Sequence, residues 1–184
     1  MNKVEPVVVI HGGAWAIPEN ISNASRNGVK LAAKKAYEIL KNGGSALDAV
    51  EEAVVILEDE AVFDAGKGSC LNAAGLIEMD ASIMDGTSLK AGWSTGHGES
   101  IIKICLAKHI ICLMESGMKA QEAVEQSLQL MNSRIKGAGG AICISASGEP
   151  AFQFTTGRMA WAIAKADVLS WGLDPKEYNT EKMA

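Results

Sequence analysis

The chain has no hydrophobic run that is both long enough and free enough of charge to span a membrane. The richest apolar stretch, Ile101–Met114, is interrupted by Lys103, Lys108 and His109. The apolar run Val7–Ile10 near the N-terminus is too short for a secretory signal, and His-Gly-Gly follows it instead of a cleavage site. We therefore expect a cytoplasmic protein.

Positive charge is also scarce. The 17 Lys and Arg residues are outnumbered by 22 Asp and Glu, which gives a net charge of -5, and no basic cluster occurs. This balance argues against nucleic acid as a partner.

None of the four cysteines lies in a C-x-x-C pair with zinc or redox spacing. Cys105 and Cys112, seven residues apart, are expected on one face of a helix as buried free thiols. All four cysteines are predicted to be reduced and structural, and no cofactor is predicted.

Glycine is plentiful, and one glycine-rich stretch organises the chain, Phe63–Gly86. Gly66 and Gly68 flank a lysine, where glycine permits a tight turn and a close approach of backbone N–H groups to a ligand. Apolar residues then alternate with polar ones over Leu76–Met84, which predicts a half-buried strand. On pattern alone, a turn is a more common explanation of such a loop than a functional site.

The remaining segments predict helices and strands in a regular order. Pro6–Ile10 indicates a fully buried strand. Helical spacing is found in Ala24–Lys41 and Ala46–Glu58, and Ser45 with Asp48 forms a capping-box pattern before the second of these. That second helix is expected to pack on a sheet through an apolar face of four residues: Leu47, Val50, Val54 and Leu57.

The second half predicts two further helices and two hairpins. The helices are Glu99–Ser116 and Lys119–Arg134. The strand pairs are Ala141–Ile144 with Ala151–Phe154, and Met159–Ala164 with Val168–Trp171. The tail from Pro175 is polar and is expected to be frayed. Together these elements predict a mixed α and β protein.

The central string G-x-G-S-x-L-N-x-x-G-x-x-E-M-D-A-S-I-M-D-G resembles the plant-type L-asparaginase and isoaspartyl peptidase family of N-terminal-nucleophile hydrolases. The segments V-x-H-G-G and S-T-G-H-G-E are also similar to that family. The resemblance implies an α+β fold, a four-layer αββα sandwich, here truncated. It also implies an asparagine or isoaspartyl peptide substrate and a dimer.

Site residues follow from the resemblance position by position. His11, Gly12 and Gly13 would shape the floor of the site, with Gly66 and Gly68 in a structural loop. That loop resembles one whose carbonyls bind sodium or potassium, and no other metal site is indicated. Thr95 and Gly96 match the substrate-contact turn, in which the Gly96 N–H would donate to the oxyanion. Asp64 falls where relatives have an asparagine that donates to the same oxyanion, which an ionised carboxylate cannot do. His97 lies in the same motif and could approach a ligand, and an exposed or packed histidine at a helix start is an alternative of at least equal weight.

The catalytic threonine of the family, which begins a strand in the pattern G-T-V-G-x-V-A-x-D, has no counterpart here. Only Thr87 follows a glycine, and no apolar run follows it. The resemblance covers two blocks, Val7–Gly92 and Ser94–Asp174, so residues 1–92 correspond to an N-terminal, α-subunit-like half. Residues 93–184 correspond to the C-terminal part of a β-subunit-like half, and the two halves are expected to form one domain.

The leading hypothesis is a catalytically inactive member of the family. One alternative is an active L-asparaginase with a relocated threonine, Thr87 or Thr95. Another is a non-catalytic partner that forms a heterodimer with an intact relative, and a third is a chain that folds without cooperativity because its central strands are missing.

Overall fold

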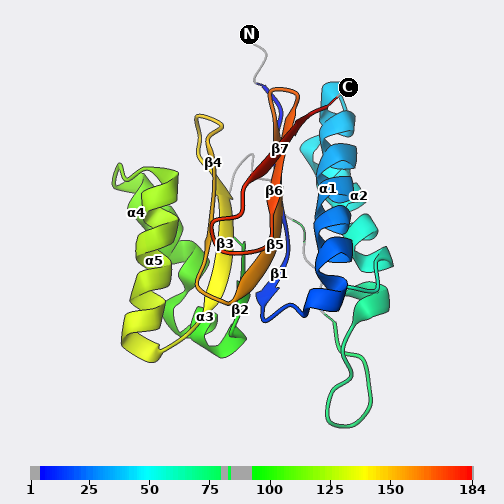
Figure 1. Cartoon of the computed structure of the whole chain (residues 1–184). Coiled ribbons are helices and arrows are strands. Elements are labelled where there is room, and N and C mark those ends of the chain that lie inside the picture. The colour runs from blue at the N-terminus through cyan, green and yellow to red at the C-terminus, as the bar shows by residue number, and fades with distance from the viewer. Residues whose placement is uncertain (1–4, 80–82, 84–92, 184) are drawn as a thin grey trace.

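The computed structural model describes residues 5–79, 83 and 93–183 as four layers, helix, sheet, sheet and helix (Figure 1). One outer layer contains α1 (Glu19–Lys41) and α2 (Ala46–Asp59). The other contains α3 (Gly98–Ile104), α4 (Leu106–Glu115) and α5 (Ala120–Ile135). The predicted α+β sandwich is therefore confirmed.

Sheet A has the strand order β1-β5-β6-β7, with all neighbours antiparallel. Its strands are β1 (Val7–Trp15), β5 (Arg158–Lys165), β6 (Val168–Gly172) and β7 (Asn179–Lys182). The first strand of the chain pairs with one near its end, in a register from Val7↔Lys165 to Trp15↔Arg158. Sheet A thus joins the two halves of the chain.

Sheet B has the order β2-β3-β4 and is also antiparallel. Its strands are β2 (Trp93–Gly96), β3 (Gly139–Ile144) and β4 (Pro150–Phe154). Both predicted hairpins, β3 with β4 and β5 with β6, are confirmed.

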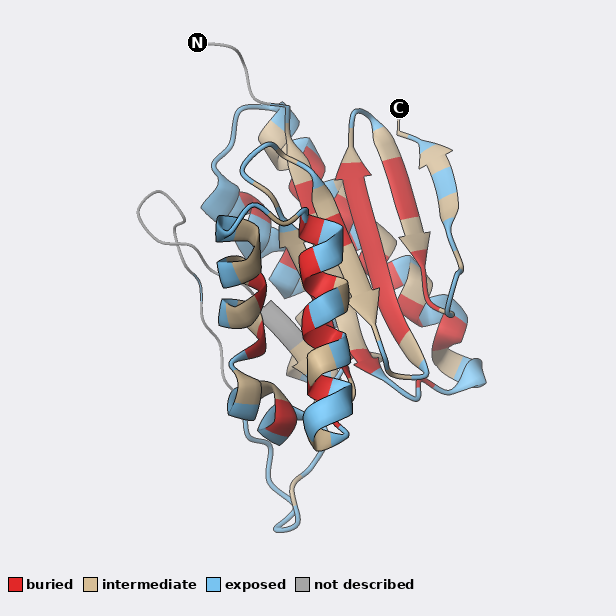
Figure 2. Cartoon of the chain, turned by 90° about the vertical axis from the view of Figure 1, so that its left-hand side faces the viewer, coloured by how far each residue is buried: buried red, intermediate tan, exposed pale blue. Residues whose placement is uncertain are grey.

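The hydrophobic core lies between adjacent layers of the sandwich. Small residues of α1 and of β5 are fully buried against one another, among them Ala32, Ala36 and Ala162. Between the two sheets, Trp161 is 0% exposed and stacks on Phe152, with the ring centroids 3.8 Å apart. Figure 2 shows the buried residues concentrated along the inner strands and the inward faces of the helices.

Helix α2 begins as the sequence predicts but packs differently. The Ser45 hydroxyl accepts from the backbone N–H of Asp48, and the Asp48 carboxylate accepts from that of Ser45, which completes the capping box. The helix is buried through Ala49 and Ala53 and packs on α1. The predicted packing face is wrong, since three of its members are exposed and the fourth is half-buried: Leu47, Val50, Val54 and Leu57.

The predicted strand Leu76–Met84 is also wrong where the structure describes it. Leu76–Met79 and Ile83 have no regular structure and are exposed. The Asn72 side chain accepts from the backbone N–H of Leu76, so the chain turns back on itself there. Alternation fixes which side chains share a face, but a strand also needs a neighbouring edge for its hydrogen bonds. Residues 80–82 and 84, the rest of this prediction, lie outside the described residues.

Four further expectations need correction. The helix predicted over Glu99–Ser116 is divided at Cys105, whose φ of 48° is left-handed. The break means that the seven-residue spacing no longer describes one helix face, and Cys105 and Cys112 are both exposed. The tail after Pro175 is not frayed, because β7 pairs with β6 and Glu181 forms ion pairs with Lys30 and Lys34. The strand at Pro6–Ile10 forms as part of β1 but is only partly buried.

The turn between β5 and β6 provides a stability prediction. Ala166 and Asp167 have φ values of 52° and 57°, a region that costs an alanine about 1 kcal/mol or more. We expect Ala166→Gly to raise the free energy of unfolding by about 1 kcal/mol in urea titrations. Ala146→Gly is the control, since Ala146 is exposed and its φ is not positive, and it should give no gain. Equal gains from both variants would contradict this account.

No helix in residues 5–79, 83 and 93–183 combines the length and the apolar character needed to cross a membrane.

Candidate functional site

Phe63 anchors the glycine-rich loop to the first strand. Its ring is 4% exposed and lies against Gly12 of β1 and Gly28 of α1. A Cβ atom at either glycine would overlap the ring, so both positions require glycine to admit the aromatic side chain. The loop that follows α2 is thereby held at β1.

The loop glycines serve the turn itself. Gly66 has a φ of 54°, and a Cβ there would overlap the Glu58 carbonyl at the end of α2. A Cβ at Gly68 would overlap the Phe63 carbonyl. Both residues therefore permit a single 3-10 turn, η1 (Gly66–Gly68), to fold back on the helix.

The Asp64 carboxylate is directed to its own loop. Its Oδ1 accepts a hydrogen bond of 2.7 Å from the backbone N–H of Cys70. The same carboxylate raises the pKa of the Cys70 thiol, because a hydrogen bond and a negative charge both disfavour the thiolate. At this position the side chain acts as an acceptor and stabilises the turn.

His11 lies at a bulge in β1, between two pairing registers with β5. Its Nδ1 accepts from the Gly13 N–H over 3.2 Å. Burial lowers the pKa of His11 to about 4, so the imidazole is neutral at pH 7. A neutral, packed ring is suited to shaping a surface and is a poor source of positive charge.

Thr95 connects the two sheets. Its hydroxyl oxygen accepts a hydrogen bond of 3.3 Å from the Ala14 N–H of β1, although Thr95 belongs to β2. Gly96 has a φ of 124°, and a Cβ there would overlap Gly139 of β3. The structure thus brings the His11–Ala14 segment and the Thr95–Gly96 turn together.

His97 is exposed and precedes α3. Its backbone N–H donates to the Ala138 carbonyl over 2.9 Å, and its Nδ1 accepts from the Ala138 N–H over 3.3 Å. These contacts tie the start of α3 to the start of β3. Thr87 lies outside the described residues, and the Asp64 carboxylate bonds within its own loop, to the Cys70 N–H.

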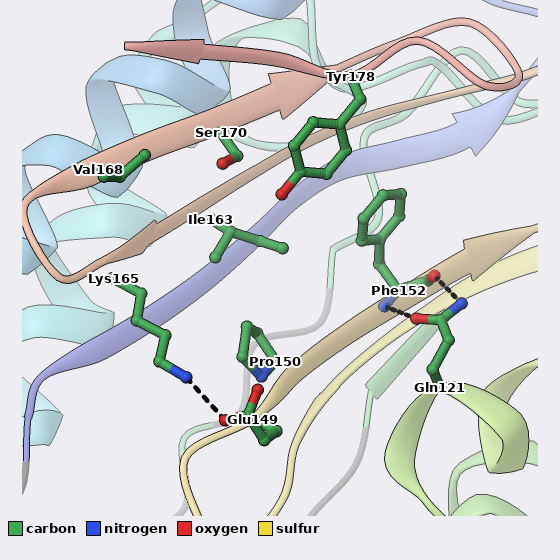
Figure 3. Close-up of a pocket in the computed structure, with 9 residues that line it drawn as sticks. All are labelled: Gln121, Glu149, Pro150, Phe152, Ile163, Lys165, Val168, Ser170 and Tyr178. Carbon is green, nitrogen blue, oxygen red and sulfur yellow. Dashed lines mark hydrogen bonds and ion pairs between the residues drawn. The ribbon is translucent and has the colours of Figure 1, made fainter. Parts of the chain in front are cut away.

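A separate hollow of about 360 Å³ lies between β4 and the β5–β6 pair, at the edge opposite β1 and β2 (Figure 3). Lys165 forms an ion pair of 3.1 Å with Glu149 at its rim. The Gln121 amide bonds to both the N–H and the carbonyl of Phe152, which satisfies the edge of β4 where a further strand would pair. The lining residues are Gln121, Glu149, Pro150, Phe152, Ile163, Lys165, Val168, Ser170 and Tyr178.

None of the residues that the sequence indicated as site residues lines this hollow. Its lining comes from five separate segments, and no motif or spacing joins them in the sequence. It offers an apolar floor with two hydroxyl groups, one amide and an ammonium group that is paired with a carboxylate. In the part of the chain that the structure describes, no group of three or more His, Cys, Asp or Glu could hold a metal ion.

The four-layer α+β sandwich is consistent with an N-terminal-nucleophile hydrolase. Comparison with known sequences shows to which family within this class of hydrolases the chain is similar. The family model described as asparaginase matches residues 4–93 and 91–172. The isoaspartyl peptidase/L-asparaginase of Xenopus laevis is 30% identical over 301 residues, which cover 96% of this chain and 97% of the relative.

The protein of the same name from Homo sapiens is 28% identical over 95% of this chain and 98% of its own length. A putative isoaspartyl peptidase/L-asparaginase of Dictyostelium discoideum is 47% identical over 108 residues, 56% of this chain and 30% of the relative. The chain belongs to the asparaginase family.

The alignments also reveal a gap. The alignment with the Xenopus laevis relative has 301 positions, whereas this chain has 184 residues, so more than a third of the positions have no residue here. The two matches to the family model meet at residues 91–93, immediately before β2 or at its first residue.

Proposed function

We propose that this chain is a non-catalytic member of the asparaginase family that keeps part of the site and lacks the nucleophile. The observation that carries the proposal is the absence of any threonine in the context G-T-V-G-x-V-A-x-D. The family reaction, hydrolysis of asparagine or an isoaspartyl peptide, needs a nucleophile activated by a base. The gap in the alignments supports the loss of the segment that would supply both.

The hydroxyl groups of three described threonines already have backbone partners. Thr95 accepts from the Ala14 N–H, Thr155 donates to the Gly139 carbonyl, and Thr156 donates to the Arg158 carbonyl. No hydrogen bond to a side-chain base is recorded for any of them in the described residues. Asp64 accepts from Cys70, so it provides no donor for an oxyanion.

A non-catalytic protein of this kind retains the Thr95–Gly96 turn and the His11–Gly13 floor, and we propose weak binding of asparagine or an isoaspartyl peptide there. Association with a second polypeptide, as a homodimer or with an intact relative, is the role that the remaining scaffold supports. We also propose a cytoplasmic location, which is supported by four free cysteines.

We expect the purified chain to show one unbroken mass and to release ammonia from L-asparagine at least about 10³-fold more slowly than the Xenopus laevis relative. Without the nucleophile the covalent step of hydrolysis cannot occur, and binding of the substrate alone accelerates its hydrolysis only slightly. Intact mass spectrometry and a coupled ammonia assay measure the two results on the same sample, and release of free aspartate is measured with an isoaspartyl dipeptide as second substrate.

Thr95→Ala is the matched control. If the starting protein released ammonia and Thr95→Ala did not, or if two fragments formed with a threonine at a new N-terminus, the chain would be an active hydrolase and the proposal would be wrong.

A further inference from the structure

Helix α2 carries an apolar face that nothing covers in the described part of the chain. Leu47, Val50 and Val54 are 38%, 48% and 42% exposed, at the three- and four-residue spacing of one helix face. A different face of the helix, which carries Ala49 and Ala53, is buried in the cluster that contains Val8 of β1. An amphipathic pattern with its larger apolar side chains exposed indicates that a covering layer is missing.

One edge of each sheet lies on the same side of the molecule. β1 is one of the two outer strands of sheet A, and β2 is one of the two outer strands of sheet B. The Ala14–Thr95 hydrogen bond holds these two edges close together. Figures 1 and 2 place α2 beside α1 on this side, and Ala49 and Ala53 of α2 share a buried cluster with Val8 of β1. An open strand edge offers unpaired N–H and carbonyl groups to another extended segment.

The charges beside this face argue against a second copy of the chain as the occupant. Glu51 and Glu58 follow Leu47 and Val54 at four-residue spacing, and α2 contains no Lys or Arg. Among the residues that the structure describes, neither carboxylate forms an ion pair. Two copies that met through this face would bring carboxylates together, and like charges are unfavourable at an interface. A partner segment with apolar side chains and flanking basic residues would match the face.

The alignments indicate what such a partner would contain. The aligned relatives carry a long segment with no counterpart here, and the matches to the family model meet immediately beside β2. β2 lies on the same side of the molecule as β1 and α2. Within the described residues, this side presents an apolar helix face and two strand edges that have no paired strand, and the gap in the alignments falls next to β2 in the sequence.

We propose that Leu47, Val50 and Val54 of α2, together with the free edge of β1, form a docking surface for an extended polypeptide segment supplied by a second protein. We call it the open-edge surface. The segment adds a strand to β1, and its apolar side chains cover α2, while its basic residues face Glu51 and Glu58. This inference rests on the proposed loss of the central segment and does not depend on the absence of hydrolysis.

The test uses the whole chain, tagged and co-expressed with the untagged segment of the Xenopus laevis relative that aligns opposite the gap. We expect the segment to co-purify at about a one-to-one ratio, and amide hydrogens of β1 to exchange at least about tenfold more slowly in the complex. The variant Val50→Lys/Val54→Lys should reduce co-purification at least about tenfold, because it places two charges on the apolar face. Leu31→Lys/Ile102→Lys is the matched control, since Leu31 and Ile102 are exposed apolar residues of α1 and α3.

Circular dichroism of each purified variant distinguishes loss of folding from loss of binding. All four substituted positions are exposed, so we expect both variants to fold. Equal capture by the Val50→Lys/Val54→Lys chain, or no capture by a folded unsubstituted chain, would overturn the proposal. So would a homodimer that only the Val50→Lys/Val54→Lys substitution dissociates. Ammonia release by the chain alone would refute the proposed function and leave the binding result unaffected.

Discussion

Replacing Phe63 by alanine is expected to lower the free energy of unfolding by about 3–5 kcal/mol. The ring is buried and fills the space between Gly12 of β1 and Gly28 of α1. Neither glycine has a side chain that could fill this space if the ring were removed. Loss of the ring leaves a cavity and releases the loop from the first strand. Urea titration followed by circular dichroism measures the change, and Leu71→Ala, at a position 65% exposed, should change stability by less than about 0.5 kcal/mol.

A double-mutant cycle tests the geometry as well as the size of the effect. Gly12→Ala alone is expected to cost about 1–3 kcal/mol, because the added methyl group overlaps the Phe63 ring. In the Phe63→Ala background the overlap is absent, so the two costs should not add. Additive costs would show that the ring does not lie against Gly12.

The second large effect concerns Glu177. Burial alone would raise the pKa of this carboxyl, but hydrogen bonds from Arg26 and from the backbone N–H groups of Asp174 and Leu173 outweigh it and lower the pKa to about 2. The folded pKa lies below the unfolded value, so the stabilisation is complete above pH 4.5 and is lost as the pH falls from 4.5 to 2.

Glu177→Gln is therefore expected to lower the free energy of unfolding at pH 7 by about 3 kcal/mol, since each pKa unit corresponds to about 1.4 kcal/mol. It should also flatten the decline in stability between pH 4.5 and 2. Glu149→Gln is the control, because the Glu149–Lys165 pair is largely exposed at Glu149, and its loss should cost at most about 1 kcal/mol. An unchanged acid decline in Glu177→Gln would contradict the assignment.

Local chemistry made much of the fold predictable. The two hairpins follow from strand-forming runs joined by short turns, and the start of α2 follows from Ser45 and Asp48. The break at Cys105 could not be foreseen, since neither glycine nor proline marks it. The end of the chain was misjudged because β7 depends on β6 and on lysines of α1, which are distant in sequence.

The candidate site also combines features that the local sequence predicts with features that depend on contacts between distant residues. Motif resemblance indicated the His11–Gly13 segment and the Thr95–Gly96 turn separately, but the contact between their strands, from Ala14 to Thr95, arises from the packing of two sheets. The apolar face of α2 was read correctly as apolar and wrongly as buried, because periodicity does not reveal whether the covering layer is present. The hollow beside Gln121 was missed, since its residues share no pattern.

The pairing of β1 with β5 also constrains how the chain is made. Within the described residues β5 is the only strand paired with β1, and the partner of Val7 is Lys165, so β1 can pair only after the residues up to Lys165 have left the ribosome. Such a distant pairing slows folding, and an unpaired apolar strand is prone to aggregation in the meantime. Yield during synthesis should therefore depend on chaperones that protect the nascent N-terminal segment.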